Sequence, residues 1–192
     1  VEDVESIIGL VEKVRAEGRK AAGKKPQIRV SVSSFVPKPH TPFQWSAQAA
    51  EAELAARHEI LRQGLQSKGT RLSWQDPKIS LLEASLSRGD RRLGQVIYKA
   101  WELGAKFDAW TERFSFDKWL KAFTEAGLDP GFYAHRERPL DEVLPWSHID
   151  IGVTDAFLKR EYQRAREGLP TPDCRVHACN ACGLEAQPVC QQ

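Results

Sequence analysis

The chain has 192 residues, 41% of them hydrophobic and 28% charged, which is ordinary for one medium globular domain or two small ones. The formal net charge of +2 provides no global attraction to nucleic acid or to a membrane surface. No apolar run approaches the roughly 20 residues of a membrane-spanning helix, and the acidic, amphipathic N-terminus is unlike a signal peptide. The Lys-, Glu- and Arg-rich composition indicates a cytoplasmic protein. Because the chain opens on Val1 and contains no Met, we expect it to be a piece of a longer protein.

The first 75 residues alternate between helix and strand patterns. Residues 2–17 place their apolar side chains on one stripe of an amphipathic helix, and the β-branched run Ile28–Ser33 alternates as a strand does. A proline-rich turn follows, then an Ala-, Glu- and Leu-rich helix over 47–67 and a short strand over Thr70–Trp74. This pattern predicts a fragment of an α/β fold that is too short to close a sheet or a barrel alone.

From Asp76 onward the pattern is mainly helical. Helices are predicted at 78–87, 91–104, 115–127 and 154–167. The third carries apolar side chains at helical spacing, namely Phe116, Trp119, Leu120 and Phe123. Such a stripe is typical of a core, and a binding platform is the alternative.

All four cysteines gather in the tail with the spacing C-x4-C-x2-C-x7-C: Cys174, Cys179, Cys182 and Cys190. The Cys-x2-Cys pair lets two thiolates reach one ion from a tight turn, and Gly183 suits such a turn. Four soft ligands favour zinc or an iron–sulfur cluster, with His177 as the alternative to Cys190 for the fourth position. Free thiols or two disulfides are the competing interpretations.

A dense charged group lies between two predicted helices: Arg88, Asp90, Arg91 and Arg92. Guanidinium groups bind phosphate or carboxylate bidentately, so this group is a candidate substrate site for an oxyanion. The alternative is a turn in which Asp90 caps the next helix. His148 and Asp150 are candidate acid–base partners or a structural hydrogen-bonding pair. No Ser-His-Asp order, Walker-type loop or G-x-G-x-x-G motif supports a hydrolase, an NTPase or a dinucleotide-binding protein.

The segment VSVSSFVPKPHTPFQW (Val30–Trp45) resembles a late barrel strand and its loop in radical S-adenosylmethionine (SAM) enzymes. It is similar to the F-x-P-R-P-G-T pattern of the methylthiotransferase branch, with Lys38 in place of Arg and His40 in place of Gly. Three further segments narrow the resemblance: SLLEASLSRGDRRLGQVIYKAWELGAKFDAW, LPWSHIDIGV and TPDCRVHACNACG. Together they resemble the C-terminal half of radical SAM proteins that a cobalamin-binding-like domain often precedes.

The resemblance implies an α/β part formed by the last βα units of a partial TIM-type barrel in residues 1–75. A helical family-specific extension would occupy 76–172, and a cysteine-rich metal-binding tail 173–192. The catalytic four-iron four-sulfur cluster and most of the SAM site would lie in the upstream barrel of the same polypeptide, and cobalamin is a further candidate cofactor there. The barrel-rim residues on the SAM side would be Ser31, Ser33, Phe35, Pro37, Lys38, Pro39 and Thr41.

Two functions remain open. In the first, the chain is the substrate-side portion of a radical SAM iron–sulfur enzyme, inactive alone, whose substrate is RNA or protein. The tail has one residue more than the catalytic C-x3-C-x2-C loop, so its metal would be accessory. In the second, the chain is a metal-stapled RNA- or protein-binding module without catalysis. Exposed aromatic rings and basic side chains would then make the contacts, the latter being Lys38, Arg88, Arg91 and Arg92.

Overall fold

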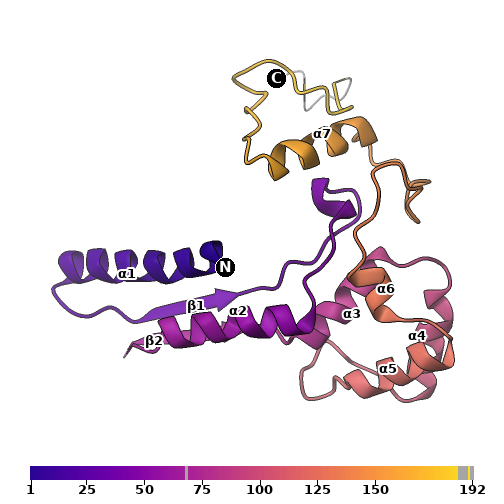
Figure 1. Ribbon diagram of the computed structural model, residues 1–192, viewed down its shortest axis with the longest axis horizontal. Helices are drawn as coiled ribbons and strands as arrows, with labels where there is room; N and C mark the ends of the chain where they lie inside the picture. Colours follow the sequence, from indigo (N-terminus) through magenta and orange to yellow (C-terminus); the bar gives the residue numbers. More distant parts are fainter. Residues whose placement is uncertain (68, 186–189, 191–192) are drawn as a thin grey trace. The chain divides into compact units, whose positions relative to one another are not determined.

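The computed structural model describes residues 1–67, 69–185 and 190, and these form two compact units (Figure 1). The α/β unit comprises Val1–Phe35 and Ala49–Leu82, and the helical unit comprises Val36–Gln48 and Glu83–Gln192. The described residues contain seven α-helices, one 3-10 helix and two strands. None of these helices is long and apolar enough to cross a membrane.

The α/β unit is built from two successive helix–strand pairs. Its elements are α1 (Glu2–Ala22), β1 (Ile28–Val32), α2 (Glu51–Gly64) and β2 (Thr70–Trp74). The strands pair in parallel, with Ile28 opposite Thr70. Parallel neighbours require a crossover connection, and α2 lies within it. The predicted order of helix and strand is confirmed in this unit, whereas the barrel stays a prediction.

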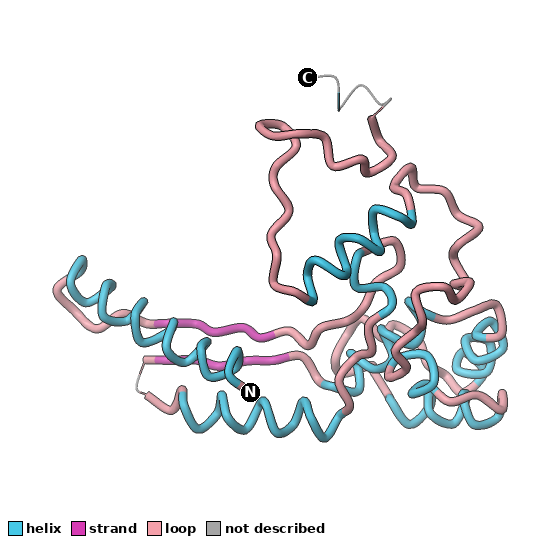
Figure 2. The backbone as a smooth tube through the Cα atoms, turned by 45° about the horizontal axis from the view of Figure 1, so that its top comes forward, coloured by secondary structure: helices cyan, strands magenta, loops and turns pink. Residues whose placement is uncertain are grey.

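Both helices of the α/β unit pack on the strand pair (Figure 2). Val11, Leu61 and Leu65 form a buried core, against which the strand residues Ile28, Val30, Val32 and Leu72 pack. Successive side chains of a strand point to opposite faces. Arg29 and Ser31 of β1 therefore point away from this core, and both are exposed. The α/β unit thus has one face covered by helices and one open polar face.

The helical unit contains the remaining elements. These are η1 (Pro42–Trp45), α3 (Pro77–Arg88, which begins in the α/β unit), α4 (Leu93–Glu102), α5 (Phe116–Glu125), α6 (Pro130–Ala134) and α7 (Asp155–Arg166). The four predicted helices of this region are confirmed. The short helices η1 and α6 were not predicted, because each is brief and starts on a proline. Proline is nevertheless favourable at a first helical position, where its missing N–H would have no intrahelical partner.

Aromatic side chains from distant parts of the chain form the core of the helical unit. Trp45 of η1 packs with Trp146 and with Leu158 and Tyr162 of α7, and the rings of Trp45 and Tyr162 are 5.9 Å apart. On α5, Trp119 and Phe123 are buried as predicted. The prediction that Leu120 is a core residue was wrong, since its side chain is 45% exposed.

Candidate functional site

The open face of β1 continues into the predicted SAM-side segment. Exposure alternates from Ser31 through Ser33 to Phe35, and these three side chains are all exposed. Since side chains two residues apart share a face of an extended chain, the three lie on the same side as the open polar face. The structure therefore places three of the predicted rim residues together, at the carboxyl end of β1.

The rest of the predicted rim belongs to the helical unit and is held by polar contacts. Pro37 is fully buried. The Lys38 ammonium lies 2.5 Å from a Glu83 carboxylate oxygen and 3.1 Å from the Ser87 hydroxyl. The Thr41 hydroxyl donates a hydrogen bond of 2.7 Å to the Lys38 carbonyl oxygen. These contacts tie the loop to α3, so Lys38 is engaged within the chain itself.

His40 occupies the position that carries glycine in the F-x-P-R-P-G-T pattern. Its φ of 55° lies in the left-handed region, which glycine adopts at no steric cost. Its backbone N–H donates to Gln44 Oε1 at 2.9 Å, and the same oxygen accepts a hydrogen bond of 2.7 Å from Trp146 Nε1. His40 thus adopts a conformation that is strained for most side chains and easy for glycine, and two hydrogen bonds to Gln44 hold this loop in place.

A pocket of about 680 Å³ at the start of α4 brings together four residues of the predicted oxyanion site. Asp90, Arg91, Arg92 and His148 line it, together with Gly89 and Pro145. The pocket unites segments that are more than 50 residues apart in the sequence, from Asp90 to His148. Sequence order alone could not have shown that His148 faces the arginines.

The charges in this pocket are unequally neutralised. The Arg92 guanidinium forms an ion pair of 2.7 Å with Asp90, and this hydrogen-bonded pair lowers the pKa of the Asp90 carboxyl. The Asp90 carboxylate also accepts a hydrogen bond from the Arg92 N–H at 2.9 Å, just before α4. Among the described residues, the Arg91 guanidinium has no hydrogen bond or ion pair. Arg91 is therefore the cation available to an anionic ligand.

The other two residues of the predicted oxyanion site, Arg88 and Asp150, form hydrogen bonds with the backbone. Arg88 is completely buried and donates to the carbonyl oxygens of Ala134 at 2.8 Å and Arg136 at 3.0 Å. Burial, and then the positive charge of Arg138, lower the pKa of Arg88 to about 10. The Asp150 carboxylate accepts a hydrogen bond of 2.7 Å from the Gly152 N–H. Neither residue lines the pocket at the start of α4.

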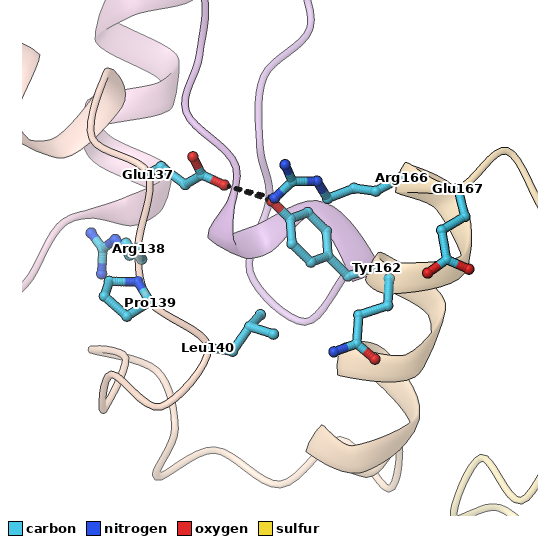
Figure 3. A pocket seen from close by; sticks show the side chains of 8 residues that line it. Glu137, Arg138, Pro139, Leu140, Tyr162, Arg166 and Glu167 are labelled. Carbon is cyan, nitrogen blue, oxygen red and sulfur yellow. Dashed lines mark hydrogen bonds and ion pairs between the residues drawn. The ribbon is translucent and has the colours of Figure 1, made fainter.

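A second pocket, of about 650 Å³, was not predicted (Figure 3). It lies between residues 137–140 and α7, and its lining includes Glu137, Tyr162 and Arg166. The Tyr162 hydroxyl donates to Glu137 at 3.0 Å, and the Arg166 guanidinium pairs with the same carboxylate at 3.3 Å. Only folding places α7 against this segment, so no local sequence signal pointed to it.

The cysteine tail folds back onto the start of α7. The Thr154 N–H donates a hydrogen bond of 2.8 Å to the Cys182 carbonyl oxygen. Gly183 follows with φ 106°, and a Cβ there would lie 2.5 Å from the Gly152 carbonyl oxygen. The Arg160 guanidinium also donates to the carbonyl oxygen of Asn180. Gly183 was predicted to suit the tight turn after the Cys-x2-Cys pair. Both its positive φ and the close Gly152 carbonyl oxygen favour glycine at this position.

Thiols are soft ligands, so the cysteines of the tail are chemically suited to zinc or an iron–sulfur cluster. All four cysteines are free; three are exposed and Cys182 is partly buried. The Ala181 N–H donates to Cys179 Sγ at 3.4 Å. Burial and the thiols of the other three cysteines raise the pKa of Cys190. Within the described part of the chain, however, no three His, Cys, Asp or Glu side chains are grouped closely enough to hold a metal ion.

Comparison with known proteins identifies one relative of undefined function. The chain is similar to an uncharacterized protein of Methanocaldococcus jannaschii, with 27% identity over 129 residues. The match covers 66% of this chain and 27% of the relative, so the chain aligns with about a quarter of the relative's length. No family model matches the chain, and no solved structure matches it.

Proposed function

We propose that this chain is the C-terminal, substrate-side portion of a radical SAM iron–sulfur enzyme and is inactive without the upstream part. The observation that carries the proposal is the polar face of the β1–β2 pair, continued by Ser31, Ser33 and Phe35. Parallel sheets in proteins are normally covered on both faces or close into barrels with helices outside. A strand pair with helices on one side and an open polar face on the other fits the rim of such a barrel.

The backbone of the proline loop supports the same proposal. His40, at the position of the pattern's glycine, adopts a left-handed conformation that glycine favours, and Lys38 and Thr41 hold the loop in shape. In the whole protein, a reduced four-iron cluster with bound SAM would supply hydrogen-atom abstraction from a substrate, RNA or protein, in the cytoplasm. The chain's own residues would shape the rim and bind substrate through the pocket at the start of α4.

The tail metal is part of this proposal. Cys174, Cys179 and Cys182 are the first candidates for ligands, with Cys190 or His177 as the fourth. Their donor chemistry fits zinc or an auxiliary iron–sulfur cluster. Convergence of the thiols would require the tail to rearrange around the ion, as expected where binding supplies the folding energy of a short segment.

The full-length protein tests the proposal. The coding sequence upstream of Val1 should contain a C-x3-C-x2-C loop, and the anaerobically purified protein should form 5′-deoxyadenosine from SAM after reduction. Iron, sulfide and zinc counts, with Cys179→Ser/Cys182→Ser as a variant, identify the tail metal: the variant should lose only the accessory site. An upstream sequence without the cysteine loop, or no SAM cleavage by the loaded protein, would falsify the proposal.

The alternative is a metal-stapled RNA- or protein-binding module without catalysis. The observation in its favour is the exposure of four aromatic side chains on and after α4, namely Tyr98, Trp101, Phe107 and Trp110. This alternative predicts a protein that binds its partner but cleaves no SAM. The search for an upstream C-x3-C-x2-C loop and the assay for 5′-deoxyadenosine therefore separate the two hypotheses.

A further inference from the structure

Four aromatic rings on and after α4 are exposed. Tyr98 and Trp101 of α4 are 57% and 55% exposed, and Phe107 and Trp110 in the following segment are 75% and 62% exposed. Trp45 of the same unit, by contrast, is 1% exposed. Burying large rings is strongly favourable, so a group of them on the surface marks a place where a partner binds.

Two of these rings lie on the exposed side of α4, close in sequence to the available cation described above. The inward face of α4 carries buried apolar side chains, namely Leu93, Val96 and Ala100. Tyr98 and Trp101 lie one helical turn apart on the exposed side of α4. Arg91 lies in the turn that leads into α4 and is exposed as well.

Cations alternate with the rings beyond the end of α4. Lys106 Nζ lies 5.7 Å from the centroid of the Trp101 ring. Arg113, with Glu112, lines a pocket of about 330 Å³ that Phe107 and Trp110 complete. The rings of Tyr98 and Trp101 are 5.9 Å apart and tilted by 35°, so they are not stacked on each other.

We propose that this surface, the α4 strip, binds single-stranded nucleic acid. The strip comprises Arg91, Tyr98, Trp101, Lys106, Phe107, Trp110 and Arg113. Aromatic rings that alternate with cations are suited to a strand whose bases stack and whose phosphates carry charge. Ten residues of α4 span about 15 Å, the length of roughly four stacked nucleotides at about 3.4 Å each. Lys106 beside Trp101, and Arg113 in one pocket with Phe107 and Trp110, are placed to pair with the phosphates of such a strand.

The α4 strip concerns binding alone and requires no cluster, SAM or tail metal. It deepens the alternative binding function, with which it shares the exposed rings, and it is independent of the radical SAM proposal, so each of these two can fail without the other. The test of the proposed function is a chemical product, whereas the test of the α4 strip is an affinity.

Fluorescence anisotropy of the full chain with labelled oligonucleotides tests the strip. Oligouridine and oligothymidine of about twelve nucleotides exceed the expected contact length and distinguish RNA from DNA. Three cations, each contributing about 0.7, predict that log affinity falls with log salt with a slope of about −2. Affinity should then fall roughly fifteenfold between about 50 and about 200 mM salt. No binding of either oligonucleotide at the lower salt concentration would overturn the proposal.

Surface variants locate the binding. Trp101→Ala and Trp110→Ala should each weaken binding about tenfold, because each removes one stacked base, while Trp101→Phe should retain most of the affinity. Phe132→Ala, at a ring that is 46% exposed on α6, is the matched control and should bind as the unmodified chain does. Arg91→Glu should weaken binding and flatten the salt dependence.

Thermal unfolding checks that these exposed positions leave the fold intact. Strip variants that bind oligonucleotide as tightly as the unmodified chain would refute the assignment. Size-exclusion chromatography provides the other decisive outcome: a dimer that Trp101→Ala converts to a monomer would make the strip a protein interface and overturn the proposal.

Discussion

Single residues in this protein show how burial changes the role of a charge. Arg88 and Arg91 are three positions apart, and both belong to the dense charged group of the sequence. Arg88 is buried and donates hydrogen bonds to two backbone carbonyl groups. Arg91 is exposed, and its guanidinium lines the pocket at the start of α4. Identical side-chain chemistry thus contributes to stability at one position and offers a binding group at the other.

Replacing Arg88 should destabilise the helical unit strongly. Arg88→Leu leaves the carbonyl oxygens of Ala134 and Arg136 without their donors, which costs about 1–3 kcal/mol for each buried group left unsatisfied. Arg91→Leu, at an exposed position, should change the free energy of unfolding by less than about 0.5 kcal/mol. Urea unfolding measures both, and equal effects for the two variants would contradict this account of Arg88.

His58 should make the stability of the α/β unit depend on pH. Its ring stacks on Trp74 at 4.5 Å, and burial lowers its pKa below the ordinary value of 6.5. Between the lowered pKa and 6.5 the unfolded chain binds more protons than the folded chain does, so the free energy of unfolding falls as the pH drops below about 6.5. His58→Gln should reduce the fall in Tm between neutral and mildly acidic pH. An unchanged dependence in the variant would show that other groups cause it.

At the scale of elements, the start of α7 organises the cysteine tail. Thr154 caps this helix, since its hydroxyl accepts a hydrogen bond from the Phe157 N–H at 3.2 Å. Its own N–H donates to the Cys182 carbonyl oxygen, so one residue both begins α7 and holds the tail. The tail therefore has a fixed anchor at Cys182–Gly183, next to the Cys-x2-Cys pair.

Gly183→Ala should detach this anchor. The new Cβ would lie 2.5 Å from the Gly152 carbonyl oxygen and 2.8 Å from Thr154 Cγ2, and φ 106° is unfavourable for alanine. The hydrogen bond to Cys182 should be lost, and the Thr154 amide should exchange with solvent roughly fivefold faster, as expected for about 1 kcal/mol. Gly168→Ala is the control, because φ there is also positive but a Cβ would meet nothing within 4 Å. Equal protection of Thr154 in both variants would exclude the anchor.

At the scale of the whole molecule, the chain passes between its two units more than once. Residues 36–48 leave the α/β unit and contribute Gln44 and Trp45 to the helical unit before the chain returns. The two units are consequently not separable by one cut. The core of the helical unit depends on a segment that lies between β1 and α2.

A fragment of residues 83–192 should fail to unfold cooperatively. It lacks Trp45, whose loss from a core costs about 3–5 kcal/mol, and it also lacks the Gln44 acceptor for Trp146 Nε1. Calorimetry should show no sharp transition for this fragment, whereas residues 36–192 should keep one. A cooperative transition in the shorter fragment would show that the segment 36–48 is dispensable.

Local patterns were sufficient to predict most elements of this protein. Periodicity predicted both strands and six long helices of the described chain, because amphipathic spacing is a property of neighbouring residues. It missed α6 and η1, which are too short to show a period and start on proline. The cysteine spacing indicated a soft metal, and that prediction stays a prediction.

Tertiary structure alone decided which of the predicted site residues share a pocket. The sequence placed Arg88 beside Asp90, Arg91 and Arg92, but folding turns Arg88 into the core and brings His148 to the remaining three. Burial depends on what the rest of the chain packs against a position, and no local pattern contains that information. The sequence by itself thus determined the elements and the chemistry of the candidate groups, whereas the packing of distant segments decided which groups are available to a ligand.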